Sequence, residues 1–181
     1  MARRIDLRPF SPDTAPADLR LEASVELHHD QLAIRYELQG PLQQLAIPPA
    51  RSGQPERRDG LWQTTCFEAF LACSGDSGYW ECNLSPAGDW NLYRLNGYRN
   101  GLRPESAITA LPWTAQRGEN RLEVAFTLPL QPLLEQRANA TGMELSLTAV
   151  LQQRGGACSY WAIQHTGPEA DFHRRDSFVP I

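Results

Sequence analysis

The sequence predicts an all-β fold, an antiparallel β-sandwich of jelly-roll type with one short helix. Apolar and polar residues alternate with a period of two over most of the chain, which is the pattern of half-buried strands. The alternating runs are short, and turns of hairpin length separate them. Eight or more strands of this kind are typical of a sandwich or a flattened barrel.

The first clear elements form a hairpin. Apolar residues alternate through residues 21–27 and again through residues 32–38, and residues 28–30 between them suit a turn. Residues 41–60 are rich in Pro, Gln, Arg and Gly. We therefore expect a short edge strand there, followed by a long loop that ends beside Trp62.

Strands also dominate the second half of the chain. We expect one near Trp113, one over residues 122–128 that Pro129 ends, and two more over residues 143–151 and 157–163. The helix is predicted over residues 130–137, where Pro132 is tolerated because it falls in the first turn.

Two strands in the middle of the chain, residues 66–73 and 79–85, form the most informative hairpin. If residues 74–77 are its loop, apolar residues pair with one another on one face: Phe67 with Leu84, Ala69 with Cys82, and Leu71 with Trp80. A slip of one residue places Phe67 and Leu71 beside acids instead. The apolar match therefore predicts the register as well as the hairpin.

A third strand is expected to follow across a loop at residues 86–89. The pairs would be Ser85 with Trp90, Asn83 with Leu92, and Glu81 with Arg94. Tyr93 and Leu95 would then join the apolar side. Glu81 and Arg94 become direct cross-strand partners in this register.

The opposite face of these strands is the candidate ligand-binding surface. It would collect five candidate ligand-binding residues, namely Glu68, Glu81, Asn83, Trp90 and Arg94. Large aromatic side chains mixed with hydrogen-bonding groups are typical of a small-molecule site. A plainer interpretation is that the Glu81/Arg94 pair only stabilises a sheet, since exposed ion pairs contribute about 0–1 kcal/mol.

Length and composition favour a single domain over residues 1–181, without repeats or linkers. The formal net charge is −4 and all 17 basic residues are arginines, scattered along the chain, so neither nucleic acid nor an anionic membrane is an expected partner. The N-terminus lacks the apolar segment of an export signal, and the four cysteines show no CxxC spacing. We expect reduced thiols and a cytoplasmic location. The oligomeric state is left open.

Three segments carry a family resemblance: LWQTTCFEAFL, YWECNLSPAGDWNLYRLNGYRNG and YWAIQHTGPEADFH. They resemble those of DOMON-like proteins related to family 9 carbohydrate-binding modules. The resemblance implies a two-sheet sandwich whose concave face binds a ligand, which is a sugar in the modules and haem in some DOMON relatives. In the family pattern an acid lies in the strand that follows an aromatic-containing loop, and Glu68 after Trp62 matches it. Glu81 matches the acid of the second strand. No segment matches the calcium-binding segments of the modules, and neither a metal nor a cofactor is expected.

In carbohydrate-binding relatives, tryptophans flank the sugar. The resemblance therefore adds Trp62 and Trp161 as candidate ligand-binding residues, although a tryptophan in an alternating strand, such as Trp161, is as often a core residue.

The function predicted from these residues is non-catalytic binding of a small polyhydroxylated molecule. Carboxylates, amides and arginine bind hydroxyl groups, while tryptophans contact the flat C–H faces of a sugar.

Three alternatives stay open. Glu68 and Glu81, expected about 7–8 Å apart as diagonal neighbours, suit an acid/base enzyme, although no standard catalytic motif is present. Haem binding would need ligands such as Met143, His165 or His173. The face can also serve to dock a protein.

Overall fold

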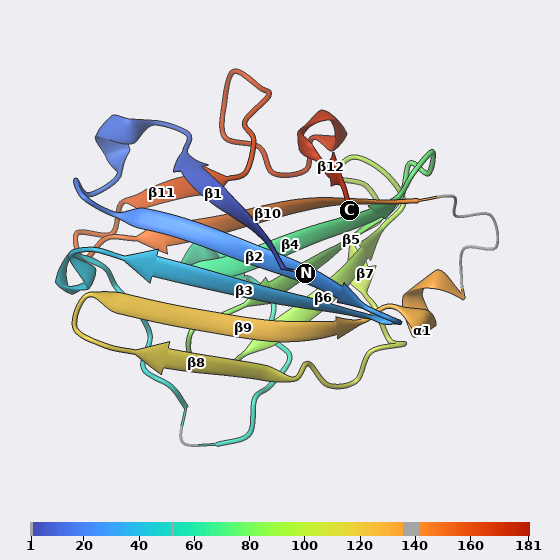
Figure 1. Cartoon of the computed structure of the whole chain (residues 1–181), viewed down its shortest axis with the longest axis horizontal. Coiled ribbons are helices and arrows are strands. Elements are labelled where there is room, and N and C mark those ends of the chain that lie inside the picture. The colour runs from blue at the N-terminus through green and yellow to red at the C-terminus, as the bar shows by residue number, and fades with distance from the viewer. Residues whose placement is uncertain (1, 52, 136–141) are drawn as a thin grey trace.

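The computed structural model describes residues 2–51, 53–135 and 142–181 of the chain. They form an antiparallel β-sandwich with one short helix, as predicted (Figure 1). The strands are β1 (Arg3–Pro9), β2 (Arg20–His28), β3 (Gln31–Gln39), β4 (Cys66–Cys73), β5 (Tyr79–Leu84), β6 (Trp90–Leu95), β7 (Arg103–Pro104), β8 (Trp113–Arg117), β9 (Arg121–Pro129), β10 (Met143–Gln152), β11 (Cys158–Ala162) and β12 (Val179–Pro180). Helix α1 spans Gln131–Leu134, and four 3₁₀ turns span Pro12–Thr14, Leu42–Gln44, Leu61–Gln63 and Arg175–Ser177.

Two sheets pack face to face. The first sheet has the order β1-β2-β3-β9-β8 and the second has the order β7-β6-β5-β4-β10-β11, with β12 added beside β10. Strand β1 belongs to both, because residues Arg3 to Leu7 pair with β2 while Arg8 and Pro9 pair with β11. In Figure 1 the first sheet lies in front of the second.

The core fills the space between the sheets. Leu32, Ile34, Tyr36 and Leu38 of β3 point into it from the first sheet, and Phe67, Ala69 and Leu71 of β4 from the second. The Tyr36 hydroxyl crosses the core and donates a hydrogen bond to the Glu68 carbonyl oxygen, 2.5 Å away. This bond ties the backbone at Glu68 to the opposite sheet.

The β4–β5 hairpin has the predicted register. Phe67 pairs with Leu84, Ala69 with Cys82, and Leu71 with Trp80, and all six side chains are buried in the core. The apolar match between the two strands was therefore sufficient to predict which face carries Glu68, Glu81 and Asn83.

The predicted register of the next pair, β5 with β6, is wrong by one residue. Trp90 pairs with Leu84, not Ser85, and Arg94 pairs with Trp80, not Glu81. The connection is one residue longer than expected, and the Ser85 N–H donates to the Asp89 carbonyl oxygen across it. Every side chain of β6 consequently points to the face opposite the predicted one.

Three further expectations need correction or completion. The described part of residues 41–60 contains a 3₁₀ turn and two isolated bridges, Leu45 with Gln153 and Arg57 with Trp90, in place of the expected edge strand. Helix α1 ends at Leu134, and the predicted continuation to residue 137 runs into residues outside those described. Strands β1, β7 and β12 were not anticipated.

The cysteines and helices add two observations. All four cysteines are free thiols. Among the described residues, no helix has both the length and the apolar character needed to cross a membrane.

Candidate ligand-binding face

The candidate site lies on the outer face of the second sheet, which we define as the side of β4, β5, β6 and β10 that points away from the core. Strands β4 and β5 are buried on both sides, so this face is itself covered. Its residues mix polar and aromatic side chains: Glu68, Phe70, Tyr79, Glu81, Asn83, Asn91, Tyr93, Ser146 and Thr148.

Within the described residues, three buried oxygen atoms on this face have no hydrogen-bond partner: Glu68 Oε1, Asn83 Oδ1 and Ser146 Oγ. They lie on neighbouring strands, because Glu68 pairs with Asn83 on one side and with Thr148 on the other, two residues from Ser146. Their residues are at most 2 % exposed. A buried polar atom without a partner costs about 1–3 kcal/mol, so a cluster of three calls for an ordered water, an ion or a bound ligand to supply the missing hydrogen bonds.

Glu81 is held by its neighbour Asn83. The Asn83 side-chain nitrogen donates to Glu81 Oε1 at 2.9 Å, which turns the Asn83 carbonyl oxygen away from Glu81. Glu68 has a weaker contact, from the Thr148 hydroxyl to Oε2 at 3.4 Å. Burial, together with the nearby charge of Glu81, raises the pKa of Glu68 well above its usual range. Burial also raises the pKa of Glu81, although the Asn83 amide and Arg99 oppose the shift.

His173 faces Glu81 from the C-terminal segment. The Tyr79 hydroxyl accepts a hydrogen bond from the Arg99 backbone N–H and also hydrogen-bonds His173 Nδ1, 2.8 Å away. The other ring nitrogen, His173 Nε2, lies 3.9 Å from Glu81 Oε2. Burial lowers the pKa of His173 to about 4, with a further contribution from Arg99. At neutral pH the imidazole is therefore uncharged.

The C-terminal segment, residues 164–178, covers one side of the face. Phe172, His173 and Phe178 all pack on Phe70, with ring centroids 5.2 to 6.4 Å apart. Asp171 fastens the segment, since it accepts hydrogen bonds from the Tyr98 hydroxyl at 2.5 Å and from the Arg99 guanidinium at 2.9 Å. Although burial opposes it, these two bonds lower the pKa of Asp171.

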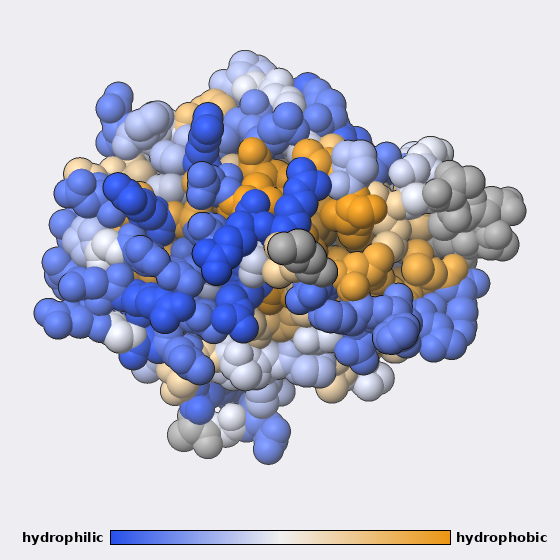
Figure 2. All heavy atoms as spheres, viewed as in Figure 1, coloured by the Kyte–Doolittle hydropathy of each residue, from blue (hydrophilic) through white to orange (hydrophobic). Residues whose placement is uncertain are grey.

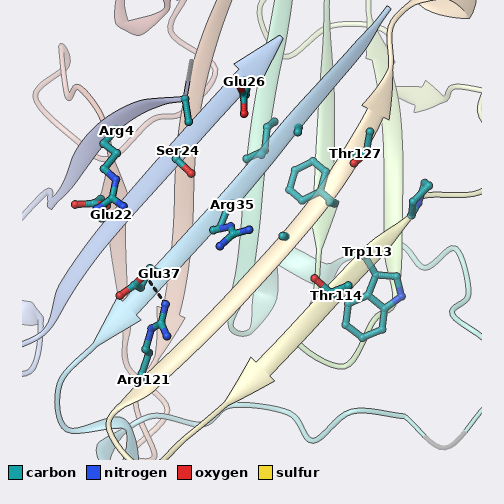
Figure 3. A pocket seen from close by; sticks show the side chains of 16 residues that line it. Arg4, Glu22, Ser24, Glu26, Arg35, Glu37, Trp113, Thr114, Arg121 and Thr127 are labelled. Atoms are coloured by element: carbon teal, nitrogen blue, oxygen red, sulfur yellow. Dashed lines mark hydrogen bonds and ion pairs between the residues drawn. The ribbon is translucent and has the colours of Figure 1, made fainter. Parts of the chain in front are cut away.

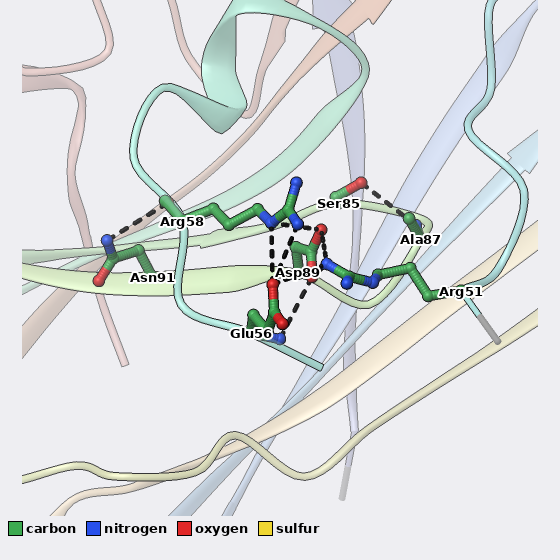
Figure 4. A network of polar contacts seen from close by, with 7 residues as sticks. All are labelled: Arg51, Glu56, Arg58, Ser85, Ala87, Asp89 and Asn91. Atoms are coloured by element: carbon green, nitrogen blue, oxygen red, sulfur yellow. Dashed lines mark hydrogen bonds and ion pairs between the residues drawn. The ribbon is translucent and has the colours of Figure 1, made fainter. Parts of the chain in front are cut away.

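A loop that includes residues 53–63 covers the other side. Asp89, in the β5–β6 connection, is buried. It accepts hydrogen bonds from the Arg51 guanidinium and the Glu56 backbone N–H, and it forms an ion pair with Arg58 (Figure 4). Asp59 of the same loop accepts from the Tyr93 hydroxyl at 2.7 Å and from the Asn91 amide at 3.1 Å. These contacts fix the loop against β6.

Trp62 is placed by this loop at the margin of the face. Its ring meets Tyr93 edge to face at 5.9 Å, and the residue is 37 % exposed. Of the candidate residues, the structure therefore brings together Glu68, Glu81, Asn83 and Trp62.

The other three candidates lie elsewhere. Trp90 packs in the core, 3 % exposed, under the guanidinium of Arg57. Arg94 points to the same inner side of β6, so the predicted contact with Glu81 is absent. Trp161 is also a core residue, because β11 pairs it with Ala149 on the inner side of β10.

Sequence reasoning missed several residues of this face. Ser146 and Thr148 alternate with Leu145 and Leu147 in β10, and that alternation alone marks them as the polar side of a buried strand. His173 lies in an irregular segment, and no periodic signal in the sequence connects it with Glu81.

The described contacts do not favour haem. His165 Nε2 lies 2.9 Å from the Arg8 carbonyl oxygen, His173 Nδ1 bonds Tyr79, and Met143 packs beside the apolar core. The part of the chain that the structure describes also brings together no three His, Cys, Asp or Glu side chains suited to a metal ion.

Comparison with known proteins bears on the fold. No protein-family model and no curated protein matches the chain. Among solved structures, a "putative carbohydrate-binding protein" from Bacteroides uniformis ATCC 8492 superposes with a TM-score of 0.72, covering 98 % of this chain and 84 % of that one at 13 % identity.

Two structures of a family 9 carbohydrate-binding module from Caldicellulosiruptor kristjanssonii also match, one with cellotriose (TM-score 0.52) and one with glucose (0.53). The chain shares their fold. The matches cover 90 % and 92 % of this chain and 72 % and 77 % of the modules, at 12 % identity. At this identity the likeness concerns the fold alone.

A groove of about 570 Å³ on the outer side of the first sheet is a competing location. Figure 2 shows this side as largely hydrophilic with an apolar strip near its centre. The charged side chains that line the groove have ion-pair partners, as in Arg4 with Glu22 and Arg121 with Glu37 (Figure 3). We favour the Glu68 face, because its buried polar atoms lack partners whereas those of the groove have them.

Proposed function

We propose that this chain binds a small saccharide through the outer face of its second sheet, without catalysis. The observation that carries the proposal is the cluster of unpartnered buried oxygens at Glu68, Asn83 and Ser146. Sugar hydroxyls both donate and accept hydrogen bonds, so adjacent hydroxyls on one ring can satisfy neighbouring oxygens on neighbouring strands.

Trp62 supplies the apolar part of the site in this proposal. Its ring is partly exposed at the margin of the face and is held there by Tyr93 and the loop that includes residues 53–63. An aromatic ring at that position offers contact area for the C–H face of a sugar. The sugars present in two structures of the same fold support the ligand class.

We propose that a ligand enters by movement of the C-terminal segment. Glu68 and Asn83 are almost completely buried, and Phe172 and Phe178 pack on Phe70, two residues along β4 from Glu68. The face reaches solvent at His173 and Glu81, whose side chains are 17 % and 6 % exposed. We therefore place the entrance beside these two residues.

Isothermal titration calorimetry with a panel of mono- and disaccharides tests the proposal. We expect binding by at least one sugar and a loss of about tenfold or more in affinity for Glu68→Ala, because leaving a buried hydrogen-bond partner unsatisfied costs about 1–3 kcal/mol. Glu22→Ala, on the outer side of the first sheet, is the matched control and should bind normally. Absence of binding across the panel, or undiminished binding by Glu68→Ala, counts against the proposal.

An acid/base reaction on the same ligand is the second candidate function. It is favoured by the raised pKa of both Glu68 and Glu81 and by the neutral imidazole beside Glu81. Consumption of a sugar during the titration, followed by NMR and abolished by Glu68→Gln with the fold intact, would establish turnover in place of simple binding.

A further inference from the structure

We infer that the preferred ligand of the outer face carries a cationic nitrogen, as an amino sugar does, and that Glu68, Glu81 and Asn83 bind this nitrogen. The inference rests on the proposed function and narrows it from saccharides in general to those bearing an amine. It follows from the charges, hydrogen-bonding capacity and orientation of the side chains on this face.

The first argument is charge. Glu68 and Glu81 are diagonal neighbours on adjacent buried strands, and the basic group that contacts either of them among the described residues is the uncharged imidazole of His173. Buried carboxylates are ordinarily paired with a cation, because an unpaired buried charge is costly.

The nearby arginines have other positions. Arg94 points to the inner side of β6, and Arg57 lies over Trp90 and donates to the carbonyl oxygens of Glu105 and Ile108. Arg99 is half exposed at the rim and pairs with Asp171. A cation on the ligand would balance the negative charge of Glu68 and Glu81, which these arginines do not contact.

The second argument is the kind of hydrogen-bonding group that is left over. Glu68 Oε1 and Asn83 Oδ1 are both unpartnered and both accept hydrogen bonds. The orientation of the Asn83 side chain is fixed by the hydrogen bond from its nitrogen to Glu81 Oε1. Its side-chain carbonyl oxygen is therefore the atom left without a hydrogen-bond partner. The Ser146 hydroxyl is a third unpartnered group, and it can also accept.

An ammonium group fits this set better than a hydroxyl does. It presents three N–H donors and no acceptor, whereas a hydroxyl presents one donor. Glu68 Oε1, Asn83 Oδ1 and Ser146 Oγ are three neighbouring acceptors, of which the first belongs to a carboxyl group and the second lies beside one. Together they match the three N–H donors of one cationic nitrogen. An anionic sugar would be repelled by the same pair of acids.

Calorimetric titration with three probes at about pH 7 tests the inference. Glucose has a hydroxyl at the position where glucosamine has an amine, and N-acetylglucosamine has a neutral amide there. We expect glucosamine to bind about tenfold more tightly than either neutral probe, since a charge-assisted hydrogen bond is roughly twice as strong as a neutral one.

A pH series on the unmodified protein gives a second readout. Glucosamine affinity should rise from about pH 5 to about pH 7 and binding should release protons, because the ammonium favours the ionised form of two acids whose pKa is raised. Glucose affinity should lack this rise. Other titratable or charged groups facing the pair are His173, Tyr79, Tyr93, Arg99 and Cys66.

The outcomes separate the inference from the proposed function. Glucose binding as tightly as glucosamine overturns the inference and leaves saccharide binding intact, whereas no binding by any probe overturns both. In Glu68→Gln, the ratio of glucosamine to glucose affinity should fall toward one. If that variant is misfolded, the pH series decides, and a glucosamine affinity that is flat with pH overturns the inference.

Discussion

Glu68, a central residue of the proposed site, carries a cost to stability. Its backbone is held from the opposite sheet by Tyr36, while one of its carboxylate oxygens has no partner. Because the folded pKa of Glu68 is raised, the folded state holds a proton at pH values where the unfolded chain has already released it. The free energy of unfolding therefore decreases as the pH rises through the folded pKa. A stable fold alone gives no reason for an acid at this position, which accords with a functional role.

His173 gives a pH dependence of the opposite sign. Its folded pKa, about 4, lies below its ordinary value of 6.5, so the unfolded chain binds a proton first as the pH falls between these values. The free energy of unfolding should therefore decrease by about 2–4 kcal/mol from this group between pH 6.5 and pH 4. Urea denaturation of the native protein and His173→Gln at both pH values measures it.

The difference between the two proteins isolates His173, because both retain the carboxyl groups that titrate in the same range. His28→Gln, which replaces a histidine whose side chain is 60 % exposed, is the control and should follow the native protein. Equal pH dependence in the native protein and in His173→Gln would contradict the assignment.

At the scale of elements, the C-terminal segment is the part that we propose moves when a ligand enters the site. It is joined to the sheet by aromatic packing on Phe70, by Asp171 with Tyr98 and Arg99, and by Arg175, which donates to Glu144 and to the Asp76 carbonyl oxygen. These contacts are few compared with those of a central strand. Segments of this kind open locally more often than the core does.

Limited trypsin digestion should detect the opening. Asp171→Asn removes the charge that Arg99 pairs with, so we expect cleavage after Arg174 or Arg175 to become about tenfold faster, the factor that corresponds to about 1.4 kcal/mol. Mass spectrometry of the fragments measures the rate. Asp13→Asn, in an exposed 3₁₀ turn, is the control, and similar rates for the two variants would show that Asp171 does not fasten the segment.

Strand registers explain how much of the site the sequence could predict. In β4 and β5 one face is wholly apolar and the other carries the acids, so a single register satisfies the pattern and Glu68, Glu81 and Asn83 were placed correctly. In β6 both faces carry large apolar residues, such as Leu92 on one side and Tyr93 on the other. Alternation therefore does not determine which face of β6 points into the core. The length of the β5–β6 connection determines it.

The buried contacts of the β5–β6 connection explain why the register of β6 could not be predicted. Asp89 is an acid next to a turn, and its sequence neighbourhood suggests an exposed loop residue. Its charge is instead buried by Arg51 and Arg58, which lie about 30 to 40 residues earlier in the chain. Long-range pairs of this kind, like the one between His173 and Tyr79, have no local pattern and come from the tertiary fold.

At the scale of the whole molecule, the two sheets also meet through Gly88 and Trp113. A Cβ atom on Gly88, whose φ is +102°, would lie 2.2 Å from the Trp113 ring, so the indole packs directly on the β5–β6 connection. This contact joins β8, at the edge of the first sheet, to the loop that carries Asp89. It helps to hold the sandwich together at the end that is farthest from β1 in the strand order.

Gly88→Ala tests this contact. We expect it to lower the free energy of unfolding by about 1–3 kcal/mol more than Gly75→Ala, because overpacking adds to the backbone strain. Gly75 is a matched control, since its φ is +81° and a Cβ there would meet no atom within 4 Å. Urea denaturation measures both, and equal losses would mean that Trp113 moves aside freely.

The sharing of β1 between the sheets has a consequence for folding. The strand can pair with β2 once both have been synthesised, but its last residues, Arg8 and Pro9, pair with Ala162 and Trp161 of β11, which come much later in the chain. Pairings so distant in sequence form slowly. We therefore expect the pairing of β1 with β11 to be a late step, and the first strand to fold in two stages.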